Sequence, residues 1–252
     1  MMGSGANIPP EVWQAVALSL RVALCAVILS LPVAVVTAQV LARGRFWGKG
    51  LLNGVVHLPL ILPPVVTGYV LLVVFAPRAP VGAFLDSLGM GVAFRWTGAA
   101  LAAAIMAFPL FVRAIRLSIE AVDPRLEEAA ATLGASRWQV WRSVTLPLIA
   151  PGIVAGAVLA FAKAMGEFGA TITFVSNIPG ETQTIPSAIY AFLQVPGGET
   201  AALWLVAISV GVALTALAVS EWVGHRVAAR VAGRDAPKSN VGSDVGRRGH
   251  DA

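Results

Sequence analysis

Long runs of apolar residues with few charges dominate this sequence, and they restrict the chain to a small set of folds. The residues are 57% hydrophobic and only 12% charged, whereas a soluble domain carries about a quarter charged residues. Inside a bilayer the backbone polar groups must be paired within the protein, which leaves α-helices or a closed β-barrel. The runs do not alternate in polarity, so they favour helices. The sequence therefore predicts an all-α, polytopic transmembrane helical bundle.

Five segments reach or approach the length of about 20 residues that a helix needs to cross a bilayer. They are residues 12–41, 51–76, 97–112 (extendable to 117), 148–168 and 201–223. A further apolar segment at 184–195 is too short for a span. It predicts a re-entrant or partly inserted helix.

The first segment is too long for a straight span. We interpret residues 12–20 as an interfacial extension and residues 22–40 as the span proper, with Arg21 reaching back to the near headgroups. No Lys or Arg precedes Arg21, and no small-residue cleavage site follows a basic region. The segment is therefore expected to be an uncleaved anchor rather than a signal peptide.

The basic residues are distributed unevenly between the loops. Lys and Arg follow the first and third predicted spans and fill the tail, while residues 166–201 contain none. Because positive residues concentrate on the cytoplasmic side, we expect the amino terminus outside, the carboxyl terminus in the cytoplasm and a cytoplasmic loop at 123–147. The net charge of +5 is explained by this distribution, so it does not indicate that the chain binds nucleic acid.

We expect the chain to divide into a membrane domain at 1–224 and a basic, disordered tail at 225–252.

The loop at 123–147 carries signals for two short helices. Asp123 and Pro124 are typical of an N-cap and a first helical residue, and Gly134 is a typical helix stop. Ser136 can cap a second helix that carries two tryptophans on one side. Composition alone is also consistent with an interfacial helix that only anchors the bundle.

The spacing in this loop is similar to a known pattern. The pattern begins with Glu128-Ala129-Ala130, followed by three residues and Gly134. Nine residues later come an aliphatic residue, one further residue and then Leu146-Pro147. This spacing resembles the EAA loop of bacterial ABC importer permeases. Three further runs, 56–69, 166–174 and 177–186, resemble the molybdate permease subunits of that group.

The resemblance implies a fold of the type I, MetI-like kind, with five spans, a short re-entrant helix and a cytoplasmic coupling helix. It also implies a homodimer in the bacterial inner membrane, two ATP-binding subunits below it and an extracytoplasmic molybdate-binding protein above it. Six residues would then couple the chain to its ATPase: Glu128, Ala129, Ala130, Gly134, Leu146 and Pro147. The chain has no Gly-Lys-Ser/Thr phosphate loop, so we expect ATP on the partner subunit, no cofactor here and no enzymatic activity of its own.

Prolines interrupt the second predicted span. Pro63 and Pro64 remove backbone donors and kink a helix, and Gly68 lies just beyond them. Such breaks are tolerated where they face protein or a water-filled path. A translocation path and an ordinary packing kink both remain open. Thr67 is the hydroxyl in this segment that would face a passing oxyanion.

Two charged residues lie deep in the fourth predicted span. Lys163 and Glu167 are four residues apart, so they can pair on one helix face, or Lys163 can lend positive potential to an anion path. We expect a mixed role, with Glu167 as the anchor. Phe168 and Gly169 follow; they suit a gate with Phe168 as its plug, or ordinary close helix packing.

Several other classes are disfavoured or left as alternatives. Cys25 is the only cysteine, and no His, Asp or Glu cluster predicts a metal or catalytic site. A sulfate, thiosulfate or tungstate permease is the alternative within the class, because all these substrates are tetrahedral dianions. A self-contained secondary transporter is the alternative outside it, and it would leave the cytoplasmic loop unexplained.

Overall fold

The computed structural model describes residues 8–232, and every regular element among them is helical. In chain order the elements are α1 (Pro10–Arg43), α2 (Lys49–Ile61), α3 (Pro64–Phe75), α4 (Pro80–Ser87), α5 (Trp96–Glu120), α6 (Pro124–Thr132), α7 (Arg137–Val140), the π-helical turn η1 (Trp141–Thr145), α8 (Leu146–Met165), α9 (Gly169–Val175), α10 (Ile185–Phe192) and α11 (Glu199–Ala232). Helix α11 continues past the expected start of the tail at 225. The prediction of disorder for 233–252 falls outside the described residues.

Four of the five predicted spans are confirmed as long apolar helices within the described part of the chain. Four helices are long and apolar enough to cross a membrane: α1, α5, the continuous run Arg137–Met165, and α11. A fifth span results if α2 and α3 are counted together, but their axes differ by 111°. The predicted second span is therefore a broken helix rather than a kinked one.

The break between α2 and α3 follows from the local sequence. Leu62 and Pro63 have extended backbone angles, and Pro64 is the first residue of α3. Neither proline has an N–H to donate, and a proline disfavours helical geometry in the residue before it. Two successive prolines thus end α2 and begin a new helix in another direction.

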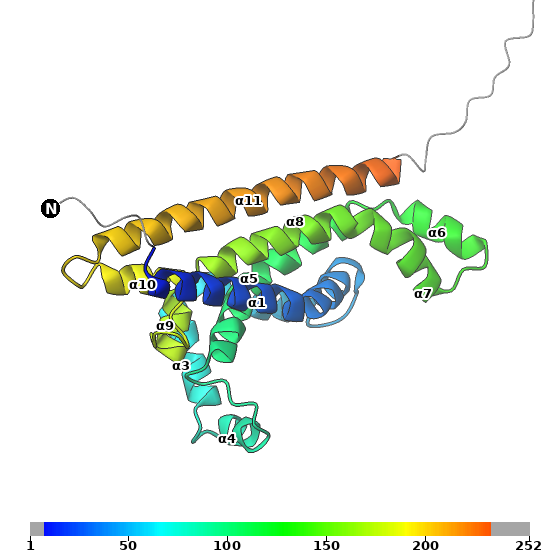
Figure 1. The fold of residues 1–252 in the computed structure, drawn as a ribbon. Helices are drawn as coiled ribbons and strands as arrows, with labels where there is room; N and C mark the ends of the chain where they lie inside the picture. Colours follow the sequence, from blue (N-terminus) through cyan, green and yellow to red (C-terminus); the bar gives the residue numbers. More distant parts are fainter. Residues whose placement is uncertain (1–7, 233–252) are drawn as a thin grey trace, which may run out of the picture.

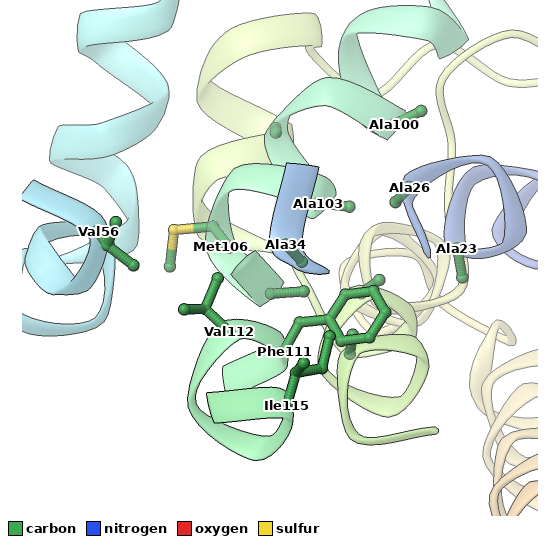
Figure 2. Close-up of a cluster of buried hydrophobic side chains, with 14 of the residues drawn as sticks. Ala23, Ala26, Ala34, Val56, Ala100, Ala103, Met106, Phe111, Val112 and Ile115 are labelled. Carbon is green, nitrogen blue, oxygen red and sulfur yellow. The ribbon is translucent and has the colours of Figure 1, made fainter. Parts of the chain in front are cut away.

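Helix α5 lies at the centre of the bundle and packs against α1, α8, α9 and α2 (Figure 1). Lipid tails are as apolar as leucine, so helices in a membrane associate through close packing, which small side chains permit. Figure 2 shows buried alanines of α1 beside those of α5, with Met106 of α5 directed toward Val56 of α2. The buried alanines that it labels are Ala23, Ala26, Ala34, Ala100 and Ala103.

The first turns of α1 differ from the expected interfacial extension. Helix α1 is continuous, and Val12 and Val16 are buried against Ile185 of α10 and Leu205 of α11. The buried Ser19 hydroxyl also accepts a 2.7 Å hydrogen bond from the Ile185 N–H. This segment is therefore part of the helix packing, because its apolar residues recur at helical spacing and form one face.

Two pairs of short helices lie at opposite ends of α8. Helices α6 and α7 lie at the amino-terminal end of α8, while α9 and α10 lie at its other end (Figure 1). Helix α8 contacts α5, α1 and α11 along its length. The predicted coupling loop and the predicted gate are thus separated by the length of α8.

Candidate functional site

The first short helix of the 123–147 loop forms as the sequence predicts. The Asp123 side chain accepts a 2.9 Å hydrogen bond from the Arg125 N–H, and Pro124 is the first residue of α6. Gly134 has φ +87°, in the left-handed region that glycine adopts most readily. Between these ends, Glu128 and Ala129 are exposed and Ala130 is partly exposed.

The second short helix is also confirmed. The Gln139 N–H donates to the Ser136 hydroxyl at 3.4 Å, and the Ser136 N–H donates to the Gln139 Oε1 at 2.7 Å, which completes a capping box. The rings of Trp138 and Trp141 stack with centroids 5.0 Å apart. The Leu133 side chain, before the turn, is 89% exposed. The loop therefore presents charged and apolar side chains together.

Leu146 and Pro147 lie at the start of α8, directly after the π turn η1. Proline lacks the N–H that would continue the α-helical bonding pattern, and π turns occur mostly as single turns inside α-helices. The helix continues from Arg137 to Met165 despite the turn. The short helix α7 is thus joined end to end with a long apolar helix.

At the other end of α8, the predicted path residues of α3 meet α9. A Cβ atom added to Gly68 would lie 2.5 Å from the Ala170 carbonyl oxygen, and one added to Gly169 would lie 2.8 Å from the Pro64 Cβ. These distances leave no room for a side chain at either glycine, so the Gly68 backbone touches the Ala170 backbone and the Gly169 backbone touches the Pro64 side chain. Thr67 is buried, and its hydroxyl has no hydrogen-bond partner among the described residues.

Lys163 and Glu167 form the predicted ion pair, with 3.0 Å between Lys163 Nζ and Glu167 Oε2. The placement of Glu167 on the fourth span is wrong, because α8 ends at Met165. Glu167 Oε1 accepts a 2.9 Å hydrogen bond from the Ala170 N–H. The Glu167 side chain is 2% exposed, so a buried carboxylate connects the end of α8 with the first turn of α9.

Phe168 likewise lies beyond α8, at the N-cap position of α9. Its ring packs on the Tyr190 ring of α10, with centroids 5.5 Å apart and planes tilted by 44°. Tyr190 was not predicted as a site residue, because no motif connects it with Phe168. The residues predicted for the path thus gather where α3, α9, α10 and the end of α8 meet.

Sequence comparison places these features in a family. The profile described as "Binding-protein-dependent transport system inner membrane component" matches residues 26–232. The chain belongs to this permease family. As a member it is a multi-pass membrane protein, in agreement with the apolar helices α1, α5, α8 and α11.

Curated relatives of this permease cover nearly all of the described chain. The molybdenum transport system permease protein ModB of Escherichia coli K12 is 58% identical over 226 residues, which are 89% of this chain and 98% of the relative. The protein of the same name from Haemophilus influenzae is 53% identical over 84% of this chain and 93% of its own length. The sulfate transport system permease protein CysT of Salmonella typhimurium is 37% identical over 73% of this chain and 67% of its own length.

Solved structures support the fold of this permease. A bacterial alginate ABC transporter in complex with a pentasaccharide-bound periplasmic protein matches with a TM-score of 0.68 and 18% identity, over 87% of this chain and 80% of that one. An amino acid ABC transporter crystallised with histidines matches with a TM-score of 0.62 and 20% identity, over 86% and 94% of the two chains. The fold is therefore that of the type I ABC importer permeases, as the sequence predicts.

Proposed function

We propose that this permease moves molybdate across the cytoplasmic membrane as the transmembrane subunit of an ATP-driven importer. The observation that carries the proposal is the 58% identity to a molybdenum transport permease along 98% of that relative's length. A sulfate transport permease is the less similar relative, at 37% identity. Sulfate, thiosulfate and tungstate remain the alternative substrates, because they are tetrahedral dianions of similar shape.

We propose that a separate ATPase docks on the 123–147 loop and drives transport. Exposed Glu128 and Ala129 on α6 and the exposed side chain of Leu133 offer a surface to that partner. ATP binds to the partner and not to this chain, and the chain itself cleaves no bond. Closure of two ATPase subunits would move α6 and α7, and through Leu146 and Pro147 at the start of α8 it would rock the spans.

The proposed assembly is a homodimer that receives the anion from an extracytoplasmic binding protein and otherwise contacts membrane lipid. The amino terminus lies outside and the loop at 123–147 lies in the cytoplasm, as the distribution of Lys and Arg indicates. Helices α9 and α10, at the opposite end of α8 from the loop, then belong to the outer half of the permease (Figure 1).

The proposed path passes the junction of α3 and α9. The unpartnered hydroxyl of the buried Thr67 can donate to an anion oxygen, and burying a hydroxyl without any partner is unfavourable. Lys163 supplies positive charge, while Glu167 fixes its position through the ion pair and the cap on α9. Phe168, beside Gly169, is placed to act as the plug. Pro63 and Pro64 set the direction of α3.

Replacing Lys163 with Met tests the role of this charge. A single Lys163→Met change leaves the buried Glu167 carboxylate without its partner, so we expect loss of both stability and uptake. The double variant Lys163→Met/Glu167→Gln removes both charges and keeps an oxygen for the Ala170 N–H. We expect it to unfold near the parent's temperature and to take up molybdate about tenfold more slowly, as loss of a bond to a charged group implies. Uptake at the parent's rate by the double variant would reject the path role.

The proposed function is tested by uptake of labelled molybdate into vesicles that contain this chain, its ATPase and its binding protein. ATP-dependent uptake that excess sulfate leaves intact supports a molybdate importer. Uptake abolished by excess sulfate moves the assignment to the sulfate permeases. Competition by tungstate measures how well the importer discriminates between molybdate and tungstate. Uptake without ATP would overturn the importer assignment and favour a secondary transporter.

A further inference from the structure

One carboxylate outside the EAA pattern contacts several elements at once. Glu127, on α6, accepts a 2.8 Å hydrogen bond through its Oε1 from the hydroxyl of Thr145, the last residue of η1. The same oxygen lies 3.6 Å from Nη2 of Arg43, the last residue of α1. Arg43 Nη2 also donates a 3.1 Å hydrogen bond to the Val122 carbonyl, in the turn between α5 and α6. These contacts join α6 to α1, α5 and the start of α8.

The burial of these groups makes the contacts specific. Thr145 is 2% exposed, so its hydroxyl has little access to water and depends on Glu127 as an acceptor. The side chains of Arg43 and Glu127 are 29% and 24% exposed, so their pair is only partly screened by solvent. The contacts of Glu127 with Thr145 and with Arg43 are therefore stronger than an ion pair on an open surface.

The space around the contacts is not filled by apolar side chains. A cavity of about 410 Å³ lies beside them, lined by Gln39 and Arg43 of α1, Glu127 of α6, and Trp141 and Thr145 of η1, among others. An unfilled space lets neighbouring elements shift against each other. The contact of Glu127 with Arg43 thus connects α6 with α1 beside this cavity.

We propose that Glu127 is a positioning residue that makes α6 move as one body with α1 and α8 when the partner ATPase moves α6. The inference rests on the proposed function, because it assumes an ATPase docked on this loop. It differs from the role predicted for Glu128, which is exposed and also lines this cavity. Glu127 faces the permease itself and transmits the movement rather than binding the ATPase.

The test compares variants in vesicles that contain the complete importer. Thr145→Val removes the hydroxyl with little change in shape, Thr145→Ser keeps the hydroxyl, and Glu127→Met removes both the charge and the acceptor oxygen at similar side-chain length. Glu120→Met is the matched control, because Glu120 is an exposed carboxylate whose 2.7 Å pair with Arg116 lies within α5 alone. The readouts are molybdate imported per ATP hydrolysed and the amount of ATPase that copurifies with the permease.

We expect Glu127→Met and Thr145→Val each to lower the ratio of molybdate to ATP about tenfold, the effect of losing a hydrogen bond to a charged group. ATPase copurification should stay at the parent's level. Thr145→Ser and Glu120→Met should keep the parent's ratio. The double variant Glu127→Met/Thr145→Val should fall no further than the worse single variant, since both changes remove the contact between residues 127 and 145.

Three results would overturn the inference. The first is a parent-like ratio in both single variants. The second is a double variant whose loss is the product of the two single losses, which would mean that the residues act independently. The third is loss of the ATPase from the variants, which would assign Glu127 to docking. A parent importer that takes up no molybdate with ATP is a different failure: it would overturn the proposed function and this inference with it.

Discussion

Replacing Gly134 with valine should reduce molybdate uptake about 5- to 30-fold, which corresponds to the ~1–2 kcal/mol cost of a left-handed backbone for a residue with a Cβ. Gly134 has φ +87° at the turn between α6 and α7. A Cβ atom there would meet nothing within 4 Å, so the cost comes from the backbone and not from a clash. We expect the turn to change direction, which displaces α6 from its position beside η1 and weakens ATPase binding.

The control for this change is Gly134→Asn, because asparagine adopts the left-handed conformation more readily than other residues with a Cβ. We expect the asparagine variant to retain most of the uptake and most of the copurifying ATPase. Normal uptake by Gly134→Val would contradict the assignment of this loop to docking. Equal losses in both variants would instead mean that the partner surface excludes any side chain at this position.

Replacing Gly68 with alanine should destabilise the permease by about 1–3 kcal/mol, the usual effect of overpacking a tight site. The added Cβ would lie 2.5 Å from the Ala170 carbonyl oxygen and 2.9 Å from the Thr173 Cβ. The first of these atoms is backbone, so α3 and α9 must separate to accept the methyl group. We expect a lower unfolding temperature in detergent and slower uptake, because the predicted path residues lie at this contact.

Gly211→Ala is the matched control, since Gly211 lies in the apolar helix α11 and a Cβ there would meet nothing within 4 Å. Alanine has the higher helix propensity, so this variant should unfold at or above the parent's temperature. An unchanged unfolding temperature for Gly68→Ala would contradict the close contact of α3 with α9. A lowered temperature with normal uptake would support the contact and reject a role for it in the path.

Features set by neighbouring residues were predictable from the sequence. The start of α6 at Asp123 and Pro124 and its end before Gly134 depend on local hydrogen bonding and backbone preference. The cap at Ser136 is of the same kind. The apolar length of each span is likewise a local property, which explains why four of the five predicted segments contain long helices.

Features that depend on distant residues were not predictable. The prolines at 63 and 64 indicated a kink, but the 111° change of direction is consistent with the packing of α3 on α9. The spacing of Lys163 and Glu167 predicted their ion pair but not the end of α8 between them. The contact of Arg43 with Glu127 joins residues far apart in the chain, and no motif marks it. The coupling and path assignments themselves stay predictions.

The π turn at Trp141–Thr145 has a consequence for how the chain tolerates changes of length. A π turn holds about one residue more than an α-helical turn, so a chain one residue shorter here can form an uninterrupted α-helix from α7 into α8. The same deletion within α6 would rotate every following side chain on that helix by about 100°. We therefore expect a single-residue deletion between Trp141 and Thr145 to leave the spans folded, whereas the same deletion within α6 should misplace the side chains of that helix.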